Sequence, residues 1–174
     1  MGIQFETDYN METLTAMARG LRKTVRRKRS RRVHIFAAVV LVLGILTILA
    51  TVAGGEPLGA SGVVTLLAML VLILVSLFED RLNAWFAKKR LLPGTEHAVA
   101  TFEEDGYVSA TSMSESRFSY AQIVAVAETE RYFVFALSSH HTQAYDKRTI
   151  RGGSIEDFRA FIAEKTGRPV EDIK

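Results

Sequence analysis

Histidines and clustered charges are the residues of this chain whose types and spacing could support chemistry. The histidines are His34, His97, His140 and His141, and none has metal-ligand spacing with a second histidine or with a carboxylate on an expected helix. We expect the adjacent pair His140-His141 in a hairpin loop, with a metal or pH-sensing role as the alternative. The chain has no cysteine, which excludes a disulfide, a thiolate metal site and a cysteine nucleophile.

Three adjacent carboxylates form the second candidate group. Glu103, Glu104 and Asp105 could hold a cation, although a solvated hairpin tip is the simpler interpretation. The sequence has no serine-centred nucleophile motif and no phosphate-binding glycine loop. We therefore expect a protein that is not an enzyme and requires no cofactor.

Three cations near the end of the chain form the candidate ligand surface. Lys147, Arg148 and Arg151 could meet an acidic peptide or a lipid phosphate near a membrane. A plain solvated edge is the alternative. This surface is the one place where the sequence suggests a bound ligand.

Most of the positive charge lies in one segment. Residues 19–32 carry nine Lys or Arg and no acid, whereas residues 91–174 carry nine against thirteen Asp or Glu. The basic segment could be a topology signal that touches anionic lipid, a nucleic-acid patch or a partner-docking helix. Its place directly before an apolar run favours the first interpretation, and we expect no nucleic-acid partner. The cluster comprises Arg22, Arg26, Arg27, Lys28, Arg29, Arg31 and Arg32.

Two long apolar runs lie between the basic segment and the C-terminal candidate groups and must help to position both. Residues 33–53 and 57–78 have the length that a helix needs to cross the hydrocarbon core, about 31 Å for the first run. Gly54 to Pro57 supplies turn chemistry between them. The alternative, two core helices of a soluble protein, is disfavoured because so small a chain has too little other apolar surface to wrap them. We predict a transmembrane hairpin.

The flanks of the runs predict how the hairpin is oriented. Basic residues crowd both outer ends, so both termini are expected in the cytoplasm of a bacterial cell, at the inner membrane. Trp85 and Phe86 are expected to anchor the connector, residues 79–94, at the interface. Small residues near one stripe of the first run predict close helix contact, with the second run or, as the alternative, in a homo-oligomer. They are Ala37, Gly44, Thr47 and Thr51.

The spacing of apolar residues changes within the segment before the hairpin. Residues 3–9 alternate apolar with polar, which predicts a strand, and residues 10–32 have apolar positions three and four apart, which predicts a basic amphipathic helix capped by Asn10. The apolar positions of this helix are Met11, Leu14, Ala18, Leu21 and Val25.

Residues 95–174 read as a small β-rich domain ending in a helix. Asp105-Gly106 predicts a hairpin turn, and Phe133, Phe135 and Leu137 are expected in the core. Ser154 should cap the final helix, which should end near Gly167. The expected strands are 97–102, 107–112, 117–120, 123–128, 132–138 and 142–146.

Short motifs in this domain resemble a known family. Phe102 to Gly106, Phe118 to Ile123, Glu128-Thr129 with Tyr132-Phe133, and Asp146 to Arg148 ahead of Phe158 resemble YcxB-like membrane proteins. The departures are Tyr120, where the family often has Trp, and Asp146, where it often has Pro. The resemblance implies a pleckstrin-homology-like fold and no established activity.

The expected fold class is therefore α+β. With residues 3–9 in the C-terminal sheet there are seven strands and one helix, and the hairpin is inserted after the first strand. We expect a membrane-anchored, non-enzymatic interaction module that binds anionic inner-leaflet lipid or an unknown protein partner. The alternatives are an accessory subunit of a larger membrane complex, such as a transporter, and a membrane-tethered enzyme.

Overall fold

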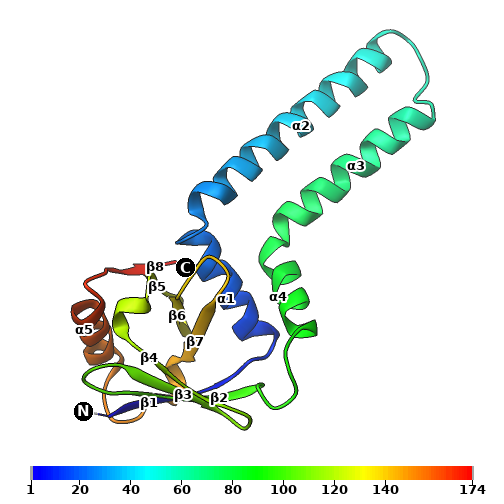
Figure 1. The fold of residues 1–174 in the computed structure, drawn as a ribbon. Helices are drawn as coiled ribbons and strands as arrows, with labels where there is room; N and C mark the ends of the chain where they lie inside the picture. Colours follow the sequence, from blue (N-terminus) through cyan, green and yellow to red (C-terminus); the bar gives the residue numbers. More distant parts are fainter. Residues whose placement is uncertain (1, 174) are drawn as a thin grey trace.

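Two four-stranded sheets build the domain from which a hairpin of long helices projects (Figure 1). The structure is a computed structural model that describes residues 2–173. The strands are β1 (Ile3–Asp8), β2 (His97–Phe102), β3 (Tyr107–Thr111), β4 (Glu115–Phe118), β5 (Ala125–Glu128), β6 (Tyr132–Ala136), β7 (Thr142–Asp146) and β8 (Val170–Asp172). The helices are α1 (Met11–Lys23), α2 (Arg27–Ala53), α3 (Ala60–Leu77), α4 (Glu79–Lys89) and α5 (Ile155–Thr166), with the short 3-10 turns η1 (Tyr120–Gln122) and η2 (Lys147–Thr149).

The first strand of the chain belongs to the same sheet as strands that follow the helical hairpin. The first sheet has the order β1-β2-β3-β4, and all its pairs are antiparallel. β1 pairs with β2 along its whole length, from Ile3 opposite Phe102 to Asp8 opposite His97. The predicted insertion of the hairpin after a first strand that joins the C-terminal sheet is therefore confirmed.

The second sheet corrects the expected strand inventory. Its order is β7-β6-β5-β8, and β8, which pairs with β5 in parallel, was not expected. Within residues 2–173 the eight strands form two sheets and no closed barrel. The strand predicted at 117–120 lies two residues earlier, because Ser119 caps η1 and removes Tyr120 from the ladder.

An aromatic core fills the space between the sheets and α5. Phe5, Phe102 and Phe158 are fully buried, with the rings of Phe5 and Phe158 4.6 Å apart. Phe133 and Phe135 lie in the same core as predicted, and Leu137 packs partly buried against it. The capping box of Ser154 with Asp157 and the left-handed Gly167 at the end of α5 are also as predicted.

The outer face of the second sheet is buried as well, which the alternating pattern did not predict. Tyr132, Val134 and Ala144 form a second cluster, against which Ala16 and Met17 of α1 pack. α1 approaches β6 so closely that a Cβ added at Gly20 would lie 2.7 Å from Cγ1 of Val134. β6 is consequently buried on both faces.

The predicted basic helix over residues 10–32 is wrong in its extent. Its start is as predicted, since the Asn10 side chain accepts from the backbone N–H groups of Glu12 and Thr13 at 2.9 and 3.1 Å. However, α1 ends at Lys23 and α2 begins at Arg27, and Val25 at the break is exposed. The chain must turn there, because α1 follows the sheet whereas α2 leaves it.

α2 and α3 are both long and apolar enough to cross a membrane, and their large apolar side chains are exposed. The less exposed positions of α2 recur three and four residues apart. They include Gly44, where an added Cβ would lie 2.7 Å from Sδ of Met69 in α3. Thr51 lies on this stripe, but Thr47 is exposed and its hydroxyl donates to the Leu43 carbonyl of its own helix. Thr47 therefore lies away from the face that packs against Met69, and its contact in a homo-oligomer stays a prediction.

Candidate anion-binding pocket

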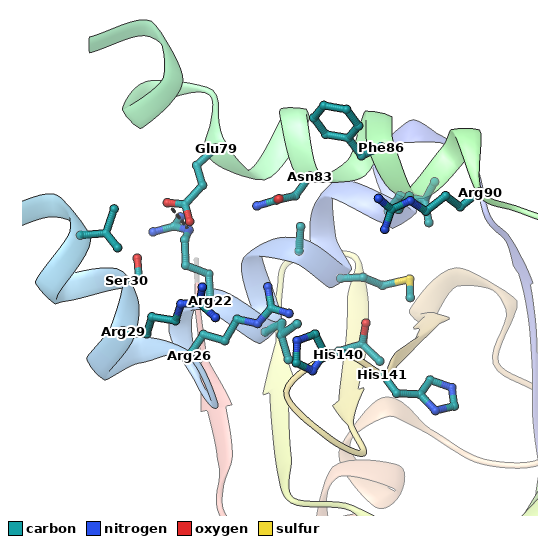
Figure 2. A pocket seen from close by; sticks show the side chains of 17 residues that line it. Arg22, Arg26, Arg29, Ser30, Glu79, Asn83, Phe86, Arg90, His140 and His141 are labelled. Carbon is teal, nitrogen blue, oxygen red and sulfur yellow. Dashed lines mark ion pairs between the residues drawn. The ribbon is translucent and has the colours of Figure 1, made fainter. Parts of the chain in front are cut away.

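A pocket of about 650 Å³ lies at the base of the hairpin, where four separate segments meet. α1 forms its floor, the first turns of α2 and the length of α4 form two sides, and the loop between β6 and β7 forms the third (Figure 2). Its polar side chains come from Arg22, Arg26, Arg29, Ser30, Glu79, Asn83, Arg90, His140, His141 and Thr142.

α4 forms one side of the pocket and follows α3 directly. Its first turn carries Glu79 and Asp80 and its last turn carries Lys88 and Lys89, an arrangement that complements the helix dipole. Ala84 is fully buried where α4 packs against α1. Small size at this position lets the two helices approach, so α4 is fixed relative to the sheet on which α1 lies.

A bidentate ion pair joins α1 to α4 beside the pocket. Nε and Nη2 of Arg22 donate to the two carboxylate oxygens of Asp80, each at 2.7 Å. The bond to Asp80 raises the pKa of the Arg22 guanidinium. Arg22 thus stays charged, its charge is balanced by Asp80, and two parallel bonds fix the angle between the helices.

Three further arginines of the pocket have no carboxylate partner among residues 2–173. Nε of Arg26 donates to the Ser139 carbonyl at 2.7 Å, which ties the start of α2 to the β6–β7 loop. Arg29 and Arg90 are exposed and extend from α2 and from the end of α4. Guanidinium groups bind phosphate and carboxylate oxygens through paired N–H donors. The arrangement is therefore suited to an oxyanion.

The β6–β7 loop that closes the pocket has a fixed conformation. The Ser138 hydroxyl accepts from the backbone N–H groups of His140 and His141, both at 3.1 Å. The predicted loop position of the two histidines is thus confirmed, and both line the pocket. Nothing in their sequence spacing indicates Arg26, Arg29 or Arg90 as neighbours.

Among residues 2–173, Glu79 is the only acid that lines the pocket, and it lies at the edge of the pocket. Oε2 of Glu79 lies 3.6 Å from Nε2 of His34 and 3.9 Å from Nε of Arg22. Glu79 therefore faces groups at the junction of α2 and α4, and Arg26, Arg29 and Arg90 keep an excess of positive charge in the pocket.

The predicted ligand surface is engaged in bonds within the chain. Nζ of Lys147 lies 2.9 Å from Oε1 of Glu128 and donates to the Thr129 carbonyl at 2.7 Å. Arg148 pairs with Asp146 at 2.9 Å and Arg151 with Glu6 at 3.1 Å. These cations stabilise the domain, and only the exposed sides of Arg148 and Arg151 remain for a ligand.

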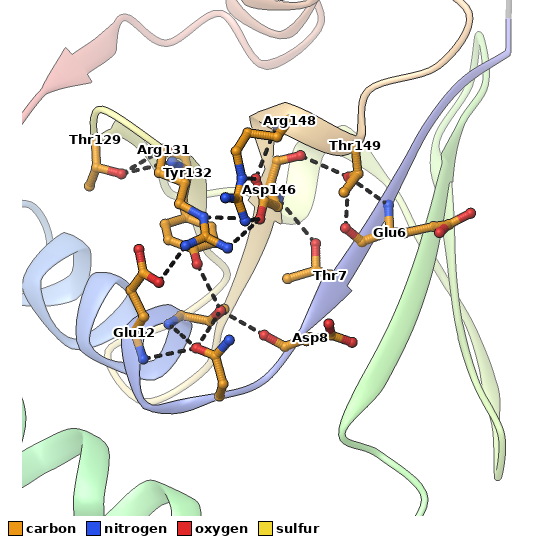
Figure 3. Close-up of polar contacts among 12 residues, drawn as sticks. Glu6, Thr7, Asp8, Glu12, Thr129, Arg131, Tyr132, Asp146, Arg148 and Thr149 are labelled. Atoms are coloured by element: carbon orange, nitrogen blue, oxygen red, sulfur yellow. Dashed lines mark hydrogen bonds and ion pairs between the residues drawn. The ribbon is translucent and has the colours of Figure 1, made fainter.

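Asp146 is the centre of a network that joins β1 to β7 (Figure 3). Its carboxylate accepts from Arg131 and Arg148, and its backbone N–H donates to the Thr7 hydroxyl at 3.1 Å. Arg131 also pairs with Glu12, at the first turn of α1. This network lies at the start of α1, whereas the pocket lies at its end.

The basic cluster of residues 22–32 is divided by the structure. Arg22, Arg26 and Arg29 line the pocket. The remaining cations of the cluster are exposed on the first turns of α2 and are Arg27, Lys28, Arg31 and Arg32. Position along the helix decides this division, because residues three and four apart share a face.

The other candidate groups are dispersed. Nδ1 of His97 pairs with Asp8 at 2.7 Å on the surface. Glu104, at the predicted hairpin tip, pairs with Lys165 at 3.1 Å, and this bond lowers the pKa of its carboxyl. Throughout residues 2–173, no group of three or more His, Cys, Asp or Glu side chains is arranged to hold a metal ion.

Comparison with known proteins places the C-terminal part in a family. Residues 102–162 match the family described as YcxB-like protein, and the match runs from the last residue of β2 into α5. No curated protein and no solved structure matches the chain. The matched segment contains the aromatic core positions Phe102, Phe133 and Phe158 and the β6–β7 loop of the pocket. The chain therefore carries a YcxB-like domain in its C-terminal part.

Proposed function

We propose that the protein is a membrane-anchored, non-enzymatic interaction module of the bacterial inner membrane. In this proposal α2 and α3 cross the bilayer, both termini are cytoplasmic, and the YcxB-like domain lies against the inner leaflet. The turn around Glu56 is then on the outer side.

The exposure of α2 and α3 supports a lipid environment for them. Large apolar side chains such as Phe36, Leu43 and Leu67 are more than half exposed, which is unfavourable in water and ordinary in hydrocarbon. At the base of the hairpin, the ring of Trp85 packs 5.0 Å from Phe86 and lies 3.5 Å beneath the Lys89 ammonium. This is the pattern of an interfacial anchor.

The packing of α1 is the observation that carries the proposal. One side of α1 covers β6 and β7, and the other packs against α4, with the Arg22–Asp80 pair at the end nearer the hairpin. The domain is thus held in one orientation at the base of α2 and α3 instead of being tethered by a flexible linker. A fixed orientation at the bilayer surface suits a module that presents one face to lipid or to a partner protein.

We also propose that the domain is pleckstrin-homology-like. The support is the antiparallel first sheet, the antiparallel run β5 to β7 packed across the same aromatic core, and the closing helix α5. The parallel strand β8 is an addition to the seven strands and one helix expected for that fold. An experimental structure that superimposes on that fold would establish the assignment, and a different strand order would exclude it.

Membrane fractionation and topology reporters test the proposed function. We expect the full chain to pellet with membranes and to resist carbonate extraction. A phosphatase reporter inserted at Glu56 should be active outside the inner membrane, whereas a fluorescent protein after the C-terminus should mature in the cytoplasm. A chain that remains in the supernatant, or a C-terminal reporter that is active outside, would exclude this function.

The alternative is an accessory subunit that docks through its spans on a larger membrane complex. Since Gly44 packs against Met69 of the same chain, such a complex has to use the outward faces of α2 and α3. Co-purification in mild detergent distinguishes the two proposals. Stoichiometric capture that is abolished by Thr47→Phe on the outward face supports the subunit, and capture that persists in this variant supports the module.

A further inference from the structure

We propose that the pocket at the base of the hairpin binds the phosphate of one anionic phospholipid headgroup from the inner leaflet. This inference rests on the proposed function, because it requires α2 and α3 to lie in the bilayer. It assigns a specific site where the sequence suggested only a general attraction of the basic segment to lipid.

The charge of the pocket is the first argument. Arg26, Arg29 and Arg90 approach the same cavity from α2 and α4, and no carboxylate among residues 2–173 pairs with them. By contrast, Arg131, Lys147 and Arg159 of the domain each pair with an acid. Three unbalanced guanidinium groups around one cavity repel each other, and a bound phosphate diester relieves that repulsion.

The height of the pocket along the hairpin is the second argument. Its wall includes Val33, the first residue of the apolar run in α2, and Glu79, the first residue of α4. With α2 and α3 in the bilayer, the cavity lies at the level of the lipid phosphates. The acyl chains of a lipid held there can leave past Val33 along the exposed apolar surface of α2.

The fixed walls are the third argument. The Arg22–Asp80 pair sets the angle between α1 and α4, and the bond from Arg26 to Ser139 holds the β6–β7 loop against α2. The pocket is therefore formed before a ligand arrives, which lowers the entropy cost of binding. Its volume of about 650 Å³ is in the range of small-molecule sites. Asn83 and Nε2 of His140 offer further hydrogen bonds to the headgroup, whereas Nδ1 of His140 is engaged with the Ser139 hydroxyl at 2.7 Å.

The test uses the full chain in nanodiscs of phosphatidylcholine containing a small fraction of phosphatidylglycerol with the same acyl chains. After gentle release, native mass spectrometry counts the lipids that each chain retains. We expect one retained phosphatidylglycerol. Arg29→Gln with Arg90→Gln should lower its retention at least tenfold, since each charged hydrogen bond contributes about a factor of ten.

The matched control removes the same charge outside the pocket. Arg32→Gln with Lys88→Gln changes exposed residues of α2 and α4 that do not line the cavity, and retention should stay within about twofold of the unaltered chain. Arg29→Lys with Arg90→Lys keeps the charge but loses the paired donors, and should give intermediate retention. Equal losses in the pocket variant and the control would reduce the effect to general surface charge and overturn the proposal.

A second arm distinguishes the lipid from a soluble phosphate or an acidic protein segment. Millimolar inorganic phosphate should not displace the retained phosphatidylglycerol. Two results together would overturn the assignment to lipid. The chain would retain phosphatidylglycerol and phosphatidylcholine equally, and inorganic phosphate or an acidic peptide would bind only when Arg29 and Arg90 are present. A chain that fails to enter nanodiscs would count against the proposed function itself.

Discussion

The tyrosines of the domain are all held in the neutral form by their surroundings. The phenol hydroxyls of Tyr107 and Tyr145 both donate to Oε1 of buried Gln143, each at 2.7 Å. Burial raises the pKa of Tyr9 from 10.0 to about 12. Burial also raises the pKa of each of the other four, Tyr107, Tyr120, Tyr132 and Tyr145.

We predict a delayed tyrosine titration. Because the folded state raises the pKa of these phenols, their neutral form stabilises the folded protein below pH 10. This stabilisation is lost as the pH rises through the pKa values of the folded state. The near-ultraviolet absorbance of tyrosinate should therefore appear well above pH 10, together with loss of the folded circular dichroism signal. A smooth titration near pH 10 in folded protein would contradict the burial of these side chains.

Glu128 balances two cations from different elements. It accepts from Lys147 at 2.9 Å and from Arg159 at 2.7 and 2.8 Å, and its side chain is 12 % exposed. The bond to Arg159, followed by that to Lys147, lowers the pKa of Glu128. Glu128 thus links β5 to η2 and α5.

Glu128→Gln should lower the free energy of unfolding by about 2 kcal/mol at neutral pH. Because the folded pKa is depressed, the stabilisation is present above the ordinary value of 4.5 and is lost as the pH falls through the folded value. The difference between variant and unaltered chain should shrink in that acidic range, as measured by chemical unfolding. Glu130→Gln, at an exposed neighbour, should have no such effect. A pH-independent difference would contradict the ion-pair origin.

At the scale of elements, β6 shows which part of the fold could be predicted from the sequence. The alternation of Phe133, Phe135 and Leu137 predicted the inner face correctly. The outer face, Tyr132 and Val134, is buried because α1 crosses it, and this packing depends on a segment far away in the chain. The uninterrupted apolar run of β6 was nevertheless a signal for a strand covered on both sides.

The pocket could not be predicted from local patterns. The acidic start and basic end of residues 79–89 could have indicated α4, and the basic cluster was expected from the sequence to touch anionic lipid, which stays a prediction. Arg90 and His140 meet that cluster only because α1 packs simultaneously on the sheet and on α4. Lys147 and Arg151 also pair with acids that are not their neighbours in sequence, Glu128 and Glu6, so these pairs could not be predicted from local patterns.

The close approach of α1 to β6 predicts that the cost of a substitution at Gly20 depends on the side chain at position 134. Gly20→Ala should destabilise the chain by about 1–3 kcal/mol, because the added methyl would lie 2.7 Å from Val134. In the background of Val134→Ala the same substitution should cost clearly less, because Cγ1 is gone and alanine favours the helix over glycine by up to about 1 kcal/mol, although Cβ of residue 134 would still lie 3.0 Å from the added methyl. Thermal unfolding of the unaltered chain, the two single variants and the double variant measures this cycle. Equal effects of Gly20→Ala in both backgrounds would exclude the contact.

The packing of α2 against α3 gives a second prediction at this scale. Gly44→Leu should separate the helices, because its side chain would occupy the position of Met69, and should lower the temperature at which the protein aggregates in detergent by several degrees. Thr47→Leu makes a similar change on the outward face and should be tolerated. If Thr47→Leu is the more harmful of the two, the assignment of faces on α2 is wrong.

At the scale of the whole molecule, the Arg22–Asp80 pair couples the domain to the hairpin. Asp80→Asn should weaken this coupling and broaden the distances between domain and hairpin, because Arg22 loses its bidentate partner. Since the chain has no cysteine, two introduced at Glu56 and Glu115 can carry spin labels that report those distances. Arg81→Gln, at the exposed neighbouring position, is the control. Unchanged, narrow distances in Asp80→Asn would show that apolar packing alone fixes the domain.

The pairing of β1 with β2 has a consequence for the order of events during synthesis. β1 and α1 leave the ribosome before the hairpin and remain without their partners until both apolar helices have been made, so the domain can complete its folding only after the hairpin has been synthesised. A fragment of residues 95–174 would lack β1 and α1, leaving the edge of β2 and the outer face of β6 open to other chains. We expect that fragment to aggregate when expressed alone and to become soluble when residues 2–23 are fused before it. Light scattering of the two fragments checks this, and a monomeric, folded 95–174 fragment would refute it.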